Sequence, residues 1–329
     1  MKLITRTVAF WDRREGAESL ALIRILLSAV IFFDLVQVVR LGLVVGLFAT
    51  PAAGGIGSGD DAGAHFAYLD WLGQSAGGAY ALVTLGMLFA FSLGIGCYSR
   101  TSAALLLLCY AQLGRLSPGA DRGIDVLLRN CLLVLACSGA GETWSLDALR
   151  RHGRFDSQHA VTAWPRYLLI AQLVLLYFWA GIQKQSAAWT SIGDYAALFM
   201  VLNQPHYARF EIPYAWLNTL YPLLQASTIA TLVFERSAIL IPLVLWLRLT
   251  RNRGGLLRVL VVEGRVLELW IATGVLFHLA LAVVAQLGIF PWGCLALYPS
   301  LVRPKFAWRA MRAALELGAS SRLTAAVRS

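Results

Sequence analysis

The stretch AYALVTLGMLFAFSLGIGC, residues 79–97, carries no charged side chain, and neither does LLIAQLVLLYFWAGI at residues 168–182. Both stretches are apolar around every face of a helix, whereas a helix on the surface of a soluble protein keeps one polar face. A helix that crosses a bilayer needs about 20 mainly apolar residues. Lipid is therefore the solvent that these two segments fit.

The composition of the whole chain supports the same environment. Hydrophobic residues make up 58% of the 329 residues and charged residues 14%, and the mean hydropathy is +0.66. A soluble domain is about half apolar and about a quarter charged. Because this apolar excess is too large for one soluble core, the sequence predicts an all-α, polytopic transmembrane helix bundle in a lipid bilayer.

The apolar segments predict about eight membrane spans. They lie near residues 20–40, 79–97, 101–116, 123–138, 164–183, 217–247, 266–285 and 288–302. The third, fourth and eighth are short, so we expect them to be tilted, paired or in part re-entrant. The sixth is long and contains Pro222 and Pro242, which predict kinks.

The basic residues are distributed unevenly among the connecting segments. The net charge is +10, but Lys and Arg lie at the ends of apolar segments, without the clustering and interleaved aromatic residues of a nucleic-acid-binding surface. Segments 1–19, 98–101, 139–166, 248–265 and 303–329 hold 20 of the 28 basic residues, and the opposite segments hold four. Because basic loops stay on the cytoplasmic side, this bias predicts that both termini are cytoplasmic.

This topology defines the expected organisation of the chain. We expect a cytoplasmic segment at 1–19, a membrane domain at 20–302 and a basic cytoplasmic tail at 303–329, in a multi-pass protein of the cell inner membrane. We expect no cleavable signal peptide, because the first 19 residues are charged and the apolar run after them is too long. As partners we expect the lipid bilayer and no nucleic acid.

Metal and soluble-enzyme motifs are absent from the sequence. The five cysteines lie in apolar runs, form no CxxC pair and have no histidine at metal-ligand spacing, so we expect no metal site. HExxH, P-loop, GxGxxG and GxSxG motifs are also absent.

Ionisable residues inside the predicted spans are costly and are therefore candidates for function. Asp125 and Arg129 are four residues apart, so they share one helix face and are expected to form a structural ion pair. Arg24 and Asp34 are ten residues apart, so each needs a partner elsewhere.

Two further ionisable groups lie in later spans. Glu235 precedes Arg236, and because adjacent residues diverge on a helix, Glu235 is expected to face the bundle and link two helices. His278 is a lone histidine in an apolar span. A hydrogen-bonded packing residue is a more frequent role for such a histidine than a metal ligand.

The end of the fifth span has a distinct pattern. Tyr177, Gly181 and Lys184 stand at positions i, i+4 and i+7 and line one helix face, where glycine permits a close approach. Lys184 could be a snorkelling lysine, with Trp189 as an interfacial anchor. It is also one of only four basic residues in the external segments. An amine kept away from water can act as a base near neutral pH, so both interpretations stay open.

Residues YFWAGIQK at 177–184, followed by Trp189, resemble the YFxAGxxK…W motif of the HTTM (horizontally transferred transmembrane domain) family. This family includes the membrane region of vitamin K-dependent gamma-carboxylases and of some bacterial peptide-toxin maturation proteins. Three weaker matches occur in the same order: LIR at 22–24 with Asp34, WSLD at 144–147, and FHL at 277–279 with Gly288 and Phe290. Together they cover about residues 20–302.

The resemblance implies roles for several residues. In the carboxylases, the lysine that matches Lys184 is thought to deprotonate reduced vitamin K on the luminal side. The resemblance therefore implies that Lys184 is a base acting on a reduced quinone, that Tyr177, Gly181 and Trp189 shape its pocket, and that His278 is a weaker candidate. Gln183 stands where the carboxylases have the first of two lysines.

Three functions fit these observations. The first is an inner-membrane enzyme that uses Lys184 as a base on a lipid-soluble, quinol-like substrate. The second is a non-enzymatic accessory role in the maturation or export of a small secreted peptide. The third, a transporter, ranks last because neither inverted repeats nor pairs of interrupted helices are evident.

The predicted topology can be tested by thiol labelling. We expect a Lys184→Cys variant to react with a membrane-impermeant maleimide added outside intact cells, and an Asn252→Cys variant to react only after permeabilisation. Labelling of position 184 only from the cytoplasmic side would overturn both the topology and the role of Lys184.

Overall fold

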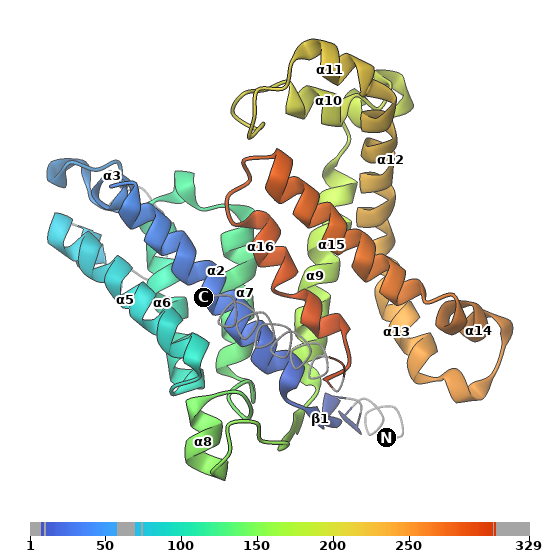
Figure 1. Cartoon of the computed structure of the whole chain (residues 1–329). Helices are drawn as coiled ribbons and strands as arrows, with labels where there is room; N and C mark the ends of the chain where they lie inside the picture. The colour runs from blue at the N-terminus through green and yellow to red at the C-terminus, as the bar shows by residue number, and fades with distance from the viewer. Residues whose placement is uncertain (1–7, 10, 58–69, 74, 305, 307–329) are drawn as a thin grey trace, which may run out of the picture. The chain divides into compact units, whose positions relative to one another are not determined.

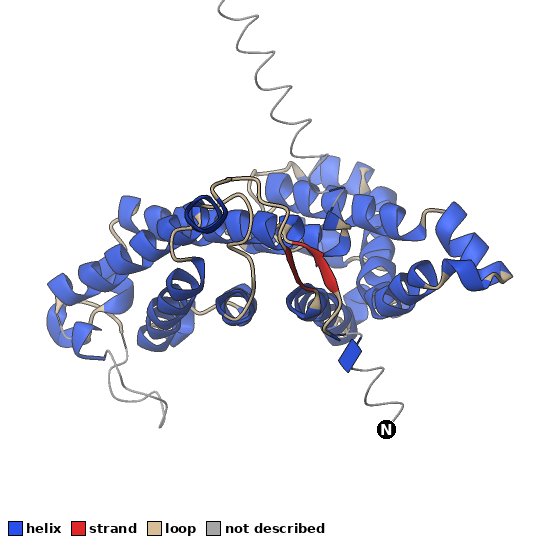
Figure 2. Ribbon diagram, turned by 90° about the horizontal axis from the view of Figure 1, so that it is seen from below, coloured by secondary structure: helices blue, strands red, loops and turns tan. Residues whose placement is uncertain are grey.

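Long helices dominate the computed structural model, which describes residues 8–9, 11–57, 70–73, 75–304 and 306 (Figures 1 and 2). The strands among these residues are β1 (Arg14–Gly16) and β2 (Ala160–Thr162), which pair antiparallel with Glu15 opposite Val161. Lipid cannot satisfy backbone polar groups, so each apolar segment closes its own hydrogen bonds as a helix. The predicted all-α fold class is confirmed.

Five helical segments are long and apolar enough to cross a membrane. They are α2 (Glu18–Arg40), α5 (Ala76–Ile95), α9 (Trp164–Gln183), α12–α13 (Tyr221–Leu249) and α14–α15 (Leu256–Val284). Each coincides with a predicted span or contains one, which supports a polytopic membrane protein. The total of eight spans and the side of the termini stay predictions.

The first of two compact units contains Met1–Ile170 and Ala296–Ser329. Its helices α2, α5, α6 (Ser99–Leu116) and α7 (Gly123–Ala136) pack against one another in chain order (Figure 1). Shorter elements complete the unit: α3 (Val44–Phe48), η1 (Pro51–Ala53), α4 (Asp70–Gly73), η2 (Pro118–Ala120), α8 (Leu146–His152) and η7 (Tyr298–Leu301).

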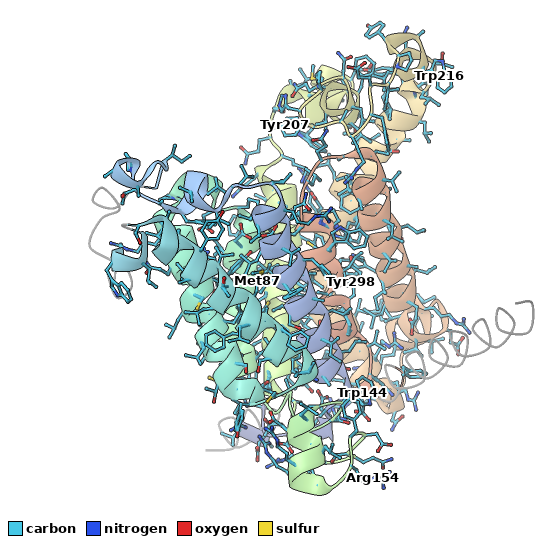
Figure 3. All side chains as sticks on the ribbon, turned by 60° about the vertical axis from the view of Figure 1, so that its left-hand side comes forward. Met87, Trp144, Arg154, Tyr207, Trp216 and Tyr298 are labelled. Carbon is cyan, nitrogen blue, oxygen red and sulfur yellow. The ribbon has the colours of Figure 1, made fainter. Side chains whose placement is uncertain are left out.

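The second unit contains Ala171–Leu295 and therefore most of α9. Besides α9 it comprises η3 (Ala187–Trp189), η4 (Ser191–Gly193), α10 (Ala197–Leu202), α11 (Tyr214–Thr219), α12 (Tyr221–Ser237), η5 (Ala238–Leu240), α13 (Ile241–Leu249), η6 (Arg251–Arg253), α14 (Leu256–Glu263), α15 (Val266–Val284) and α16 (Phe290–Leu295). Helix α12 packs against α10 and α15. A small core near the start of α12 contains Leu202, Leu217 and Leu224, in the region where Figure 3 labels Tyr207 and Trp216.

The structure differs from the expected eighth span. Residues 288–302 do not form one helix but divide into α16 and η7. A helix of six residues rises only about 9 Å, so α16 alone is too short to cross a bilayer.

The two prolines of the sixth span hold equivalent positions. Pro222 is the second residue of α12 and follows the break at Leu220 between α11 and α12, and Pro242 is the second residue of α13 and follows η5. A proline in the first turn of a helix lacks an N–H that would have no helical partner there, so each proline begins a new helix and the span is interrupted at both expected places. Most of the predicted tail at 303–329 lies outside the described residues.

Candidate functional site

Lys184 follows the last residue of α9 and forms an ion pair with Glu235 of α12. Its Nζ lies 2.7 Å from Glu235 Oε1 and 2.6 Å from Oε2. The ammonium also donates to the carbonyl of Ala180 at 3.3 Å, and it lies 5.1 Å from the centre of the Trp189 ring. The Lys184 side chain is 21% exposed and the Glu235 side chain 6% exposed, so the pair is open to its surroundings mainly on the lysine side.

Gly181 of α9 lies in close contact with α12. A Cβ at this position would lie 3.0 Å from the Cβ of Glu235 and 3.0 Å from the Cγ of Arg236. Arg236 Nε also donates to the carbonyl of Gly181 at 3.0 Å. Both neighbours on α12 therefore contact the end of α9, and the prediction of a close approach at Gly181 is confirmed.

Tyr177 contacts His278 of α15 in the interior of the same unit. The Tyr177 hydroxyl lies 2.5 Å from His278 Nε2, and both side chains are almost completely buried. Aromatic rings surround them, since Tyr177 packs edge-on against Phe234 and Trp270 while Phe290 lies against His278. The predicted role of His278 as a hydrogen-bonded packing residue fits this contact.

The structure therefore brings together the candidates of the second unit. Lys184, Glu235 and Trp189 meet at the end of α9, and Gly181 sets the distance between α9 and α12. Tyr177 lies one to two turns deeper on α9 and contacts α15. The remaining candidates, Arg24, Asp34, Asp125 and Arg129, belong to the first unit and form separate contacts.

Arg24 is completely buried in the first unit and donates to four backbone carbonyls. Its acceptors lie at the end of α5 and in the connection between α7 and α8: Leu93, Gly94 at 2.8 Å, Ala140 at 3.1 Å and Trp144 at 2.6 Å. A cation at a helix C-terminus is favourable because the carbonyls there lack helical partners. Arg24 thus has the partner that its position in a span requires.

The expected ion pair of Asp125 with Arg129 does not form. Arg122 contacts Asp125 at 2.9 Å and Asp34 at 2.7 Å, while Arg129 pairs with Asp121 at 2.7 Å. The short connection between α6 and α7 places Arg122 next to Asp125 and Asp121 next to Arg129. Each helical residue therefore pairs with a residue of the connection and not with its neighbour on α7. Arg122 had no sequence signal beyond its charge.

Tyr110 of α6 completes the contacts of Asp125. Its hydroxyl donates to Asp125 Oδ1 at 2.5 Å, and both side chains are buried. Sequence analysis missed this contact, because a tyrosine in an apolar helix gives no indication of its partner.

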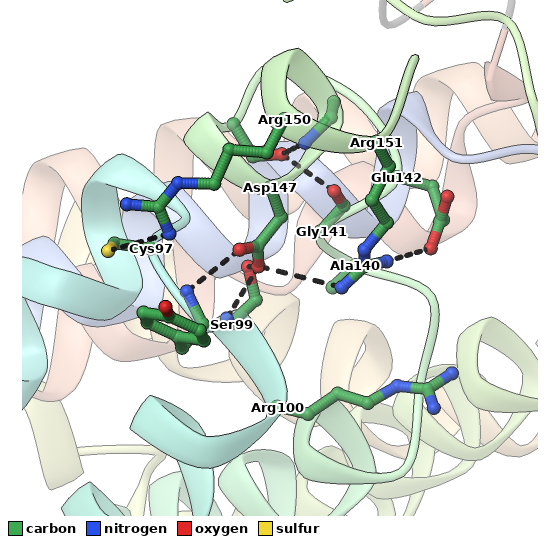
Figure 4. Close-up of polar contacts among 12 residues, drawn as sticks. Cys97, Ser99, Arg100, Ala140, Gly141, Glu142, Asp147, Arg150 and Arg151 are labelled. Carbon is green, nitrogen blue, oxygen red and sulfur yellow. Dashed lines mark hydrogen bonds and ion pairs between the residues drawn. The ribbon is translucent and has the colours of Figure 1, made fainter.

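Asp147 accepts three hydrogen bonds at the start of α8 (Figure 4). Its donors are the backbone N–H of Tyr98 at 2.8 Å and the backbone N–H and hydroxyl of Ser99, both at 2.7 Å. Burial favours the neutral carboxyl, but these hydrogen bonds and the nearby Arg151 outweigh burial and lower the pKa of Asp147. The Asp147 carboxylate is therefore an anion that links α8 to the start of α6 through these hydrogen bonds.

The four matched sequence stretches meet in two pairs. LIR at 22–24 contacts WSLD at 144–147 through the Arg24–Trp144 hydrogen bond. The YFWAGIQK stretch contacts FHL at 277–279 through Tyr177 and His278. Among the described residues, no group of three His, Cys, Asp or Glu side chains could hold a metal ion.

The fold and these buried charges define a polytopic helical membrane protein. The model of the HTTM domain matches residues 13–306, almost the whole chain. The chain belongs to the HTTM family. No curated protein and no solved structure matches it.

The close approach at Gly181 can be tested with Gly181→Ala. The added methyl group meets side chains of α12 at 3.0 Å, so α9 and α12 must move apart by a few tenths of an ångström. We expect a loss of stability of about 1–3 kcal/mol, measured as a lower melting temperature in detergent. Gly77→Ala is the control, because nothing lies within 4 Å of its added Cβ. Equal melting temperatures for the two variants would contradict the proposed packing.

The pKa of Asp147 predicts a pH-dependent contribution to stability. Because the folded-state pKa of Asp147 is lowered, its contribution is complete above the unfolded-state pKa of about 4 and is lost as pH falls through the folded-state pKa. We expect Asp147→Asn to lower the melting temperature at pH 7 and to differ less from the wild type near pH 3. A difference that stays constant between these pH values would show that ionisation of Asp147 does not contribute.

Proposed function

We propose that this HTTM protein is an enzyme of the cytoplasmic membrane in which Lys184 and Glu235 form an acid–base couple. The substrate class is a lipid-soluble molecule with a weakly acidic hydroxyl group, such as a reduced quinone. The observation that carries the proposal is the contact of Lys184 Nζ with both carboxylate oxygens of Glu235, at 2.6 and 2.7 Å, at the end of a membrane helix.

A lysine can act as a base only when its amine is neutral. In this site the proton on the ammonium of Lys184 has an acceptor at hydrogen-bond distance, the carboxylate of Glu235. Transfer of this proton within the pair gives a neutral amine and a carboxylic acid without changing the net charge of the site. The amine then takes the proton of the substrate hydroxyl, and Glu235 releases its own proton to water.

Other side chains of the second unit would position this couple. Trp189 lies against the ammonium and limits its rotation. The hydrogen bond between Tyr177 and His278 holds the deeper part of α9 against α15. Arg236 fixes the end of α9 through the carbonyl of Gly181. These four residues support the geometry of Lys184, and His278 is too deeply buried in this structure to contact a substrate at the end of α9.

A structural ion pair is the competing interpretation. In that case Lys184 and Glu235 only neutralise each other, and the protein could be an accessory factor in the maturation of a small peptide. The two functions differ in what they require of residue 184, because an ion pair needs a positive charge and a base needs a removable proton.

Substitution of Lys184 separates the two functions. Arginine keeps the charge but is not deprotonated in proteins, so we expect Lys184→Arg to fail as completely as Lys184→Ala. Loss of general-base catalysis typically costs about 10²–10⁴-fold in rate. Dioxygen oxidises a deprotonated quinol to the quinone and is itself reduced to hydrogen peroxide, so the measurement is oxygen uptake by proteoliposomes that contain the purified protein and a reduced menaquinone, with membrane insertion checked in parallel.

Glu235→Gln provides a second variant, and Arg209→Gln is a control that removes a charge outside the couple. We expect the first to lose activity and the second to retain it. Full activity of Lys184→Arg would exclude a base at this position.

A further inference from the structure

The hairpin formed by α13, η6 and α14 exposes both arginine and apolar side chains. We propose that this hairpin binds the phosphate headgroups of anionic phospholipids through Arg251 and Arg253, with the apolar face of α14 in the acyl region. The proposal does not depend on the chemistry of Lys184, and the residues involved lie in a different part of the second unit.

The charges of this segment are strongly unbalanced. Residues 248–268 contain five arginines and two glutamates. Arg248 is neutralised by Glu268, with contacts of 2.6 and 2.8 Å. Glu263 is exposed at the far end of α14. The other four arginines outnumber Glu263, so the segment keeps a net positive charge.

Arg258 holds the turn between the two helices. Its guanidinium donates to Thr250 Oγ1 at 3.1 Å and to the carbonyl of Gly254 at 3.0 Å, and it lies over the ring of Trp246. Gly254 and Gly255 have φ angles of +68° and +101°, which let the chain reverse within a few residues. The guanidinium of Arg258 thus stabilises the turn and is not part of the proposed phosphate site.

Arg251 and Arg253 lie at the tip of this turn and are exposed. In the described part of the chain, neither side chain has a hydrogen-bond or ion-pair partner. Guanidinium groups bind phosphate through two parallel hydrogen bonds and are less strongly hydrated than ammonium groups. Two such groups in one turn form an uncompensated site for anions.

The adjacent helix α14 has an apolar surface that protein does not cover. Leu256, Leu257 and Leu260 are 73%, 66% and 56% exposed, and no residue of α14 is buried. An exposed apolar helix next to unpaired basic residues is the arrangement of a helix that lies in the membrane interface. Charge complementarity therefore favours anionic lipid as the occupant of this surface.

Native mass spectrometry of the full chain in detergent tests the proposal. The protein is titrated with dioleoyl phosphatidylglycerol and, separately, with dioleoyl phosphatidylcholine. We expect Arg251→Gln/Arg253→Gln to weaken phosphatidylglycerol binding about tenfold or more, with phosphatidylcholine binding unchanged. The melting temperature without added lipid should not change, because neither side chain has a described partner.

Arg40→Gln/Arg154→Gln removes the same charge from two other exposed positions. We expect this control to keep phosphatidylglycerol affinity, and an equal loss in the control would overturn the proposed site. Wild-type affinity in Arg251→Gln/Arg253→Gln would also overturn it. Conversion of a wild-type dimer into a monomer by the same substitutions would identify the surface as a protein interface and overturn lipid binding.

Discussion

A charged side chain in a lipid-embedded protein needs its partner inside the protein, because hydrocarbon offers none. This constraint explains the main long-range contacts of both units. Arg24 of α2 donates to carbonyls at the end of α5 and in the α7–α8 connection. Glu235 of α12 pairs with Lys184 at the end of α9. Without these partners, each charge would destabilise the helix that carries it, so the same contacts stabilise the bundle and position its candidate chemistry.

The proposed acid–base couple depends on a short distance between two helices. Glycine at position 181 permits that distance, and the carbonyl of Gly181 then becomes an acceptor for Arg236. The ion pair of Lys184 with Glu235 forms three residues further on, directly after the end of α9. One small residue therefore permits the close packing of α9 and α12 beside the ion pair.

Several elements of the fold could be predicted from the sequence, and others could not. The apolar segment at 164–183 became α9 with the same bounds, because a long apolar segment in lipid must form a helix. Residues 288–302 were equally apolar, but they divide into α16 and η7. The i, i+4 spacing of Asp125 and Arg129 also predicted the wrong ion pair, because Asp121 and Arg122 from the α6–α7 connection reach them.

Hydropathy and charge distribution by themselves determined a helical membrane protein, and the motif around Lys184 identified its family. These properties depend on the solvent of each segment and on local spacing, both of which are readable along the chain. Only the tertiary structure decided that Lys184 pairs with Glu235, that Tyr177 contacts His278, and that Asp34 shares Arg122 with Asp125. Partners in a helix bundle come from different helices, and their choice depends on packing that no local pattern encodes.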